Sequence, residues 1–218
     1  LISNFYRPGV DTPGTDILKN KQEGVMYKKQ MSFQKLVCYL ALAAGLIVFI
    51  YSLGIMTDLY DCLYSTMLDP SDLTYTTVPG SIVYYNMQGF NRTFLVTGIW
   101  LLLSACLLFI SQTNNRRRYY IGNYVFIGIF VVSMLAVAIW AHFQIEIYKA
   151  QWLSVDFEAL ARHASIFKQK YTESTFWFDI HYAVFGFGLV EAGLLVFNTV
   201  WKVKLMKGEK ALIQGGRS

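Results

Sequence analysis

The chain has 218 residues, of which 55% are hydrophobic and only 15% are charged, whereas soluble domains carry about 25% charged residues. Its formal net charge of +5 does not indicate a nucleic-acid partner, because the basic residues match no nucleic-acid-binding module. Three cysteines without a CxxC pair argue against a disulfide scaffold or a thiol oxidase, and the sequence has no glycine-rich phosphate-binding loop for ATP.

The first thirty residues are polar and have no apolar core, so they lack the pattern of a cleavable signal peptide. We expect residues 1–30 to form a disordered arm. The chain begins at Leu1, and Met26 and Met31 are alternative translation starts that would remove most or all of this arm from the protein.

Four long apolar stretches follow, at about residues 36–57, 93–111, 119–143 and 181–203. A helix of about 20 apolar residues crosses the roughly 30 Å hydrocarbon core of a bilayer. The sequence therefore predicts an all-α integral membrane protein. Its four-helix transmembrane bundle would occupy residues 31–206, and a short tail would follow at residues 207–218.

The basic residues lie mostly on one side of the four predicted spans. That side holds 14 of the 19 Lys and Arg residues, including the run Arg116, Arg117 and Arg118. The five on the other side are Arg92, Lys149, Arg162, Lys168 and Lys170. Because cytoplasmic loops are enriched in Lys and Arg, we expect both termini in the cytoplasm, with the arginine run as a topology anchor. The protein would then be a multi-pass protein of the plasma membrane, with outward loops at residues 58–92 and 144–180.

The two outward loops differ in character. The first contains the turn signals DPSD and VPG, and the β-forming segments YTT and SIVYY allow a short hairpin. The second has apolar residues at spacings of three or four, which predicts an amphipathic helix that Ser154 or Asp156 would cap. These apolar residues are Phe157, Leu160, Ala161, Ala164, Phe167 and Tyr171. The helix would lie on lipid headgroups, cover the mouth of the bundle or dock a partner.

Glu191 lies about half way along the fourth predicted span. A carboxylate in hydrocarbon costs a few kcal/mol, so it normally faces the protein interior or a cavity. One interpretation is a proton or cation site, or a contact with a cation of a partner subunit. The alternative is a protonated glutamic acid that is hydrogen-bonded to a Ser, Thr or Asn of a neighbouring helix.

Four further polar residues lie at the outer ends of the third and fourth spans. His142 and Glu146 are one helical turn apart, and Asp179 and His181 begin the fourth span. Neighbouring antiparallel helices would bring them together as a polar cluster on the outer face, and two His with two carboxylates can bind zinc. Such residues are also common where helices leave the membrane, and no spacing here resembles HExxH. We therefore predict no catalytic residue, metal ligand or cofactor.

Small residues recur at a spacing of four in two of the predicted spans. Ala41 and Gly45 form one such pair, and Gly188 and Ala192 form the other. This spacing lets helices approach closely, either within the bundle or in self-association.

Three segments, FNRTFLVTGI, NNRRRYYIGNYV and YTESTFWFDI, resemble a family of uncharacterised four-span proteins of Gram-positive bacteria that are often encoded near sugar ABC-transporter genes. The resemblance covers about Met31 to the C-terminus and supplies no catalytic or binding residue. It implies an association with carbohydrate uptake in the plasma membrane.

The leading hypothesis is a non-enzymatic accessory or scaffold subunit of a plasma-membrane complex. Its partners would be the lipid bilayer and another membrane protein or a second copy of the chain. One alternative is a small transporter or channel for cations or protons that uses Glu191. A second alternative is a membrane-embedded metalloenzyme built on the outer polar cluster.

Overall fold

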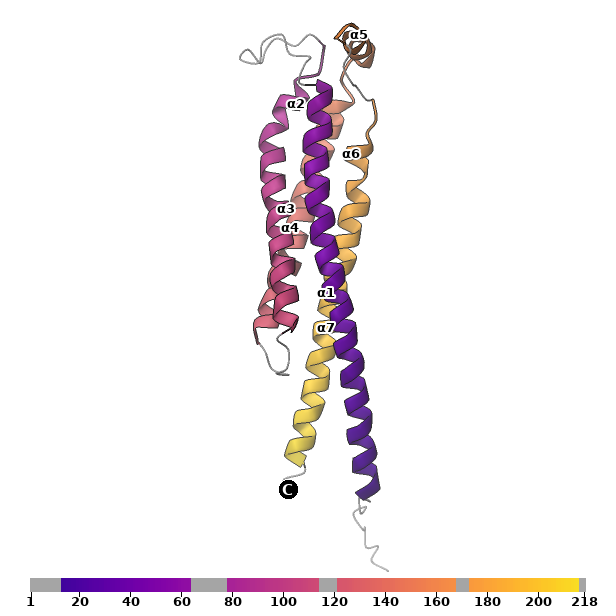
Figure 1. The fold of residues 1–218 in the computed structure, drawn as a ribbon, viewed down its shortest axis with the longest axis vertical. Coiled ribbons are helices and arrows are strands. Elements are labelled where there is room, and N and C mark those ends of the chain that lie inside the picture. Colours follow the sequence, from indigo (N-terminus) through magenta and orange to yellow (C-terminus); the bar gives the residue numbers. More distant parts are fainter. Residues whose placement is uncertain (1–12, 64–77, 114–120, 168–172, 216–218) are drawn as a thin grey trace, which may run out of the picture. The chain divides into compact units, whose positions relative to one another are not determined.

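The computed structural model describes residues 13–63, 78–113, 121–167 and 173–215 (Figure 1). The chain order of its helices is α1 (Pro13–Leu63), α2 (Val83–Asn86), α3 (Gln88–Thr113), α4 (Ile121–Trp152), α5 (Phe157–Phe167), α6 (Phe176–Asp179) and α7 (His181–Gly215). This confirms the predicted all-α class. The arginine run at residues 116–118 lies outside the described residues.

Four of these helices contain stretches that are long and apolar enough to cross a membrane, which confirms the four predicted spans. The stretches are Val25–Thr57, Gln88–Gln112, Asn123–Trp152 and Phe176–Gly208. Most of them reach beyond the predicted boundaries, because the helices continue past their most apolar cores. The protein is a multi-pass membrane protein with a helical transmembrane bundle.

The chain is helical from Pro13, where the sequence led us to expect a disordered arm up to residue 30. That expectation is wrong for residues 13–30. Positions 27, 30 and 34 of α1 are at least half-buried and recur at helical spacing, but glutamines occupy two of them. A buried helical stripe that carries glutamine gives no hydropathy signal, so this part of α1 could not be predicted from apolar spacing.

The structure divides into two compact units, Leu1–Leu36 with Phe197–Ser218, and Val37–Val196. In the first unit, parts of α1 and α7 meet through buried polar side chains. The amide nitrogen of Gln30 donates hydrogen bonds to Asn198 Oδ1 over 2.9 Å and to Gln34 Oε1 over 3.2 Å. The Phe33 ring lies edge-on to Phe197, with ring centroids 6.0 Å apart. This unit is thus held by amide hydrogen bonds and aromatic contacts.

The second unit is the bundle, in which parts of α1 and α7 run alongside α3 and α4 (Figure 1). The small residues of the spans lie where helices approach each other. A Cβ on Gly45 would lie 3.1 Å from the Leu102 Cα of α3, and a Cβ on Gly188 would lie 2.6 Å from the Met134 sulfur of α4. The predicted small residues therefore pack helices against one another within this unit.

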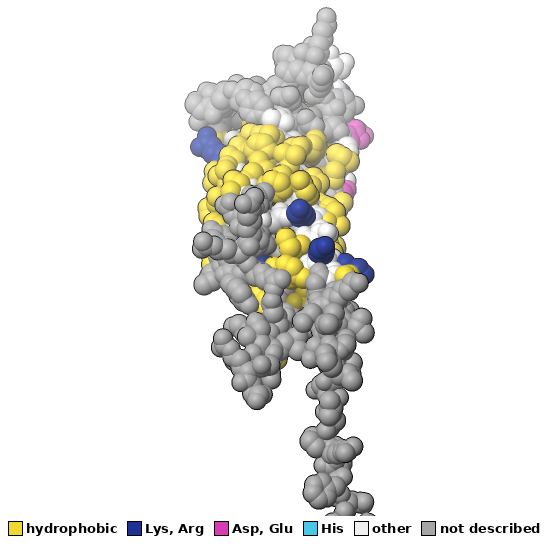
Figure 2. Space-filling model, turned by 60° about the horizontal axis from the view of Figure 1, so that its bottom comes forward, with side chains coloured by type: hydrophobic (Ala, Val, Ile, Leu, Met, Phe, Trp, Pro, Cys, Tyr) yellow, Lys and Arg dark blue, Asp and Glu magenta, His cyan; other side chains and the backbone are white. Residues whose placement is uncertain are grey.

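The outward faces of the long helices carry large apolar side chains. Figure 2 shows a broad hydrophobic surface in which few charged side chains appear. Val96, Val132 and Val190, on three different helices, are each about two-thirds exposed. Lipid tails solvate such residues as well as a protein core does, so these exposed faces fit a bilayer.

One end of the bundle carries a small cap, which we define as residues 78–87 and 153–167. Its two halves meet at Gly80, which has a φ of +83° and would place a Cβ only 2.8 Å from the Ser154 carbonyl oxygen. The Asp156 backbone N–H donates a hydrogen bond to the Pro79 carbonyl over 3.1 Å. Two loops far apart in the sequence are therefore joined into one structure.

The prediction of a short hairpin in residues 58–92 is wrong for the segment SIVYY, residues 81–85. Residues 81–82 form a turn and residues 83–86 form α2. The side chains of Val83, Tyr84 and Met87 are buried, and α2 packs on α3 and α4. Burial at positions 83, 84 and 87 has helical periodicity, so packing outweighed the β-propensity of the valine and tyrosines. The YTT segment, residues 75–77, lies outside the described residues.

The amphipathic helix predicted in residues 144–180 is confirmed as α5. Asp156 is its cap, because Asp156 Oδ1 accepts a hydrogen bond from the Ala159 N–H over 2.9 Å. The Phe157 ring packs on Trp152 with ring centroids 5.6 Å apart, and Leu160 is buried. These two apolar residues of α5 therefore cover the chain's own helices.

Candidate functional site: a polar cluster beneath the cap

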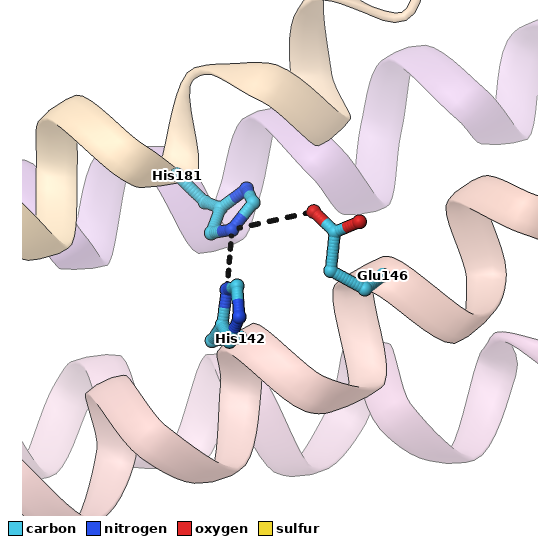
Figure 3. Close-up of side chains that lie close together, drawn as sticks. All are labelled: His142, Glu146 and His181. Carbon is cyan, nitrogen blue, oxygen red and sulfur yellow. Dashed lines mark hydrogen bonds and ion pairs between the residues drawn. The ribbon is translucent and has the colours of Figure 1, made fainter.

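Three ionisable side chains converge at the capped end of the bundle, within the second unit (Figure 3). His142 and Glu146 lie one turn apart on the same face of α4, and His181 is the first residue of α7. We refer to these three residues as the His–Glu cluster. The helical spacing places His142 and Glu146 on one face of α4, and the packing of α7 beside α4 brings His181 next to them.

A backbone hydrogen bond fixes the orientation of His181. Its Nδ1 donates to the Phe178 carbonyl oxygen, at the end of the short helix α6 that precedes it. The proton therefore sits on Nδ1, and Nε2 keeps a free lone pair that points toward α4. The side chain is buried, so this tautomer is held in a confined position.

The free nitrogen of His181 faces both cluster members of α4. It lies 2.9 Å from His142 Nδ1 and 3.7 Å from Glu146 Oε1. The first distance is a hydrogen bond in which His142 donates, since His181 Nε2 carries no proton. At the second distance, the Glu146 carboxylate lies near His181 but forms no direct hydrogen bond with it.

Tyr182 completes the surroundings of the carboxylate. Its hydroxyl donates a hydrogen bond to Glu146 Oε1 over 2.8 Å, and its ring lies against the His181 ring with centroids 4.0 Å apart. This tyrosine was not among the residues predicted for the cluster, although it is the chain neighbour of His181.

The structure places Asp179, the fourth residue of the predicted cluster, in a neighbouring ion pair. Asp179 Oδ1 lies 2.6 Å from Lys149 Nζ, and Thr175 donates a second hydrogen bond to the Asp179 carboxylate. Asp179 belongs to α6, whereas His181 begins α7. Lys149 was not among the residues predicted for the cluster either, although positions 142, 146 and 149 share one helical face.

The ligand atoms of His142, Glu146 and His181 all lie within 4.8 Å of one another, which is close enough for one ion to contact all three. His142 and Glu146 are partly exposed, while His181 is enclosed. The cluster can therefore exchange protons with its surroundings or hold a cation from the capped end.

Glu191 lies ten residues, or nearly three turns, after His181 on α7, within the same unit. Its side chain is 1% exposed, and neither carboxyl oxygen has a hydrogen-bond partner among the residues that the structure describes. Glu191 thus faces the interior of this chain, and its carboxyl group is closed to the surface.

Comparison of the chain with protein-family models, with curated proteins and with solved structures finds no match.

Proposed function

We propose that the chain is a non-enzymatic accessory or scaffold subunit of a plasma-membrane complex. Its bundle would anchor the subunit, and the cap would be its recognition surface outside the cell. The observation that carries this proposal is the joining of two distant loops at Gly80 into one ordered structure. A bundle that served only as an anchor would not need to hold its loops together in this way.

The distribution of basic residues supports the orientation in this proposal. The side that carries both termini holds 14 of the 19 Lys and Arg residues. A C-terminal green fluorescent protein should therefore fluoresce in bacterial cells, and a C-terminal alkaline phosphatase should be inactive. The opposite pair of results would show that the orientation is reversed and that the cap faces the cytoplasm.

The resemblance of three segments to four-span proteins encoded near sugar ABC transporters extends the proposal to a partner. Under this proposal, the partner is a membrane component of a carbohydrate-uptake system. The resemblance supplies no residue of the interface, so the assignment of this contact to the cap depends on the joining of its two halves at Gly80.

The test is native purification from the membrane in mild detergent, comparing the wild type with Gly80→Ala. A Cβ at position 80 would meet the Ser154 carbonyl at 2.8 Å, so the substitution should separate the two halves of the cap. The matched control is Gly89→Ala in α3, where a Cβ would have nothing within 4 Å. We expect the wild type and the control to retain a membrane transporter component that Gly80→Ala loses. A wild-type protein that is monodisperse and carries no partner would contradict the proposal.

Glu191 supports a second candidate function, a small transporter for cations or protons. A carboxyl group inside a transmembrane bundle with no hydrogen-bond partner in the described structure is a typical position for a transported ion. The structure, in which the Glu191 carboxyl group is enclosed, would then represent one state of an alternating-access transport cycle. Purified protein in liposomes should give a cation or proton flux that Glu191→Gln abolishes. Absence of flux from the wild type, or equal flux from the variant, would eliminate this function.

A further inference from the structure

We propose that the His–Glu cluster is a binding site for one divalent transition-metal ion, with Zn²⁺ as the best match. The ligands would be His142 Nδ1, His181 Nε2 and one carboxylate oxygen of Glu146. This inference is independent of the proposed function, because it needs neither a partner nor transport.

The ligand types suit this ion. Two imidazoles and one carboxylate are a known zinc ligand set that leaves a fourth position for water. The three residues come from two helices, α4 and α7, and their ligand atoms already lie within 4.8 Å of one another. An ion here would therefore bridge two helices that are continuous through the bundle.

The distances are close to those of a metal centre. Zinc–nitrogen bonds of about 2.0–2.1 Å at tetrahedral angles separate two ligand atoms by about 3.3 Å. The present separations are 2.9 Å between the two histidine nitrogens and 3.7 Å between His181 Nε2 and Glu146 Oε1. Of these two separations, one must widen and the other must shrink, each by about 0.4 Å. The third separation, between His142 and Glu146, lies within 4.8 Å and must also approach this value. Rotation of the partly exposed His142 and Glu146 side chains can supply these changes.

The outer shell of the site is already in place. Metal-bound histidines usually donate their second N–H to a carbonyl or carboxylate, and ligating carboxylates are usually hydrogen-bonded as well. His181 donates Nδ1–H to the Phe178 carbonyl, and Tyr182 donates its hydroxyl to Glu146. Two of the three ligands are thus oriented before any ion arrives.

The charges around the cluster also permit a cation. The neighbouring basic side chain of Lys149 forms an ion pair with Asp179 at 2.6 Å, so its charge is largely balanced. Without a metal, His142 holds a proton on Nδ1 and donates it to His181. To bind the ion, His142 adopts the tautomer with its proton on Nε2, and the metal takes the place between the two rings.

The test uses the purified full-length chain in detergent micelles, stripped of metal with a chelator and titrated with Co²⁺. Tetrahedral Co²⁺ absorbs visible light, and Zn²⁺ added afterwards should displace it. We expect one equivalent of Co²⁺ per chain. Because loss of an outer-shell partner alone weakens metal sites about 10- to 100-fold, loss of a direct ligand should weaken binding by about 100-fold or more.

Two variants and one control make the result specific. His142→Asn and Glu146→Gln remove ligands that are partly exposed, so both variants should remain folded by circular dichroism. Glu158→Gln changes an exposed glutamate of α5 and should bind like the wild type. Wild-type protein that is folded but binds no Co²⁺ or Zn²⁺ overturns the proposal. Equal binding by the wild type and both ligand variants overturns it too.

Discussion

The indole ring of Trp177 lies directly against Gly54, and a Cβ on that glycine would be only 2.1 Å from the ring. One turn earlier on α1, the Tyr51 hydroxyl donates a hydrogen bond to the Trp177 backbone carbonyl over 2.8 Å. The tyrosine and tryptophan rings are stacked at a centroid distance of 6.4 Å. The short helix α6, which precedes His181 of the His–Glu cluster, is therefore held on α1 by an aromatic contact that requires a glycine.

Gly54→Ala should destabilise the bundle at this contact. The tryptophan ring cannot remain in place, and overpacking of this kind typically costs about 1–3 kcal/mol of unfolding free energy. Thermal unfolding in detergent should show the loss, and tryptophan fluorescence should shift. The control is Gly128→Ala in α4, where a Cβ would have nothing within 4 Å and stability should be unchanged or slightly higher. Equal stability of both variants would contradict the contact.

Position 191 should tolerate glutamine but not lysine. An enclosed carboxyl group without a partner in the described structure is favoured in its neutral form, and glutamine has nearly the same shape. Glu191→Gln should therefore change the free energy of unfolding by less than about 1 kcal/mol, whereas Glu191→Lys should prevent folding or insertion. Expression level and thermal unfolding measure both. A glutamine variant as damaged as the lysine variant would mean that an ionised carboxylate is required.

The sequence predicted the four spans from their long apolar stretches, and α5 from apolar residues at helical spacing. It also placed His142 and Glu146 on one face of a helix, since their spacing of four is enough. It could not place Asp179, because α6 ends at that residue and α7 begins at His181. Asp179 also faces α4, but it reaches Lys149, three residues beyond Glu146, and not the two histidines.

The helix at residues 13–30 was missed for a related physical reason. Hydropathy detects buried apolar stripes, and this one contains Gln30 and Gln34. Gln30 donates a hydrogen bond to Asn198, which is far away in the sequence. A polar contact between distant segments has no signature in either segment alone.

The hydrogen bond between Gln30 and Asn198 should contribute measurably to the first unit. Asn198→Leu removes the acceptor and leaves an amide donor of buried Gln30 without it, which should cost about 1–3 kcal/mol. Adding Gln30→Leu replaces both partners by apolar groups and should recover part of that loss, because buried Gln34 then loses the hydrogen bond from Gln30. Thermal unfolding of the two single variants and the double variant gives the comparison. A double variant as unstable as the sum of the singles would show that the two amides act independently.

The ion pair between Lys149 and Asp179 should contribute little to stability, although it is short. Both side chains are partly exposed, at 24% and 47%, and exposed pairs typically contribute about 0.2–1 kcal/mol. A double-mutant cycle with Lys149→Met and Asp179→Asn should give a coupling energy in that range. The coupling should fall when the salt concentration is raised, because salt screens exposed charges. Lys149→Met combined with Glu158→Gln is the control, for which additive effects are expected. A coupling well above 1 kcal/mol that resists salt would mean that the pair is shielded from water in the membrane, so that breaking it leaves a buried charge.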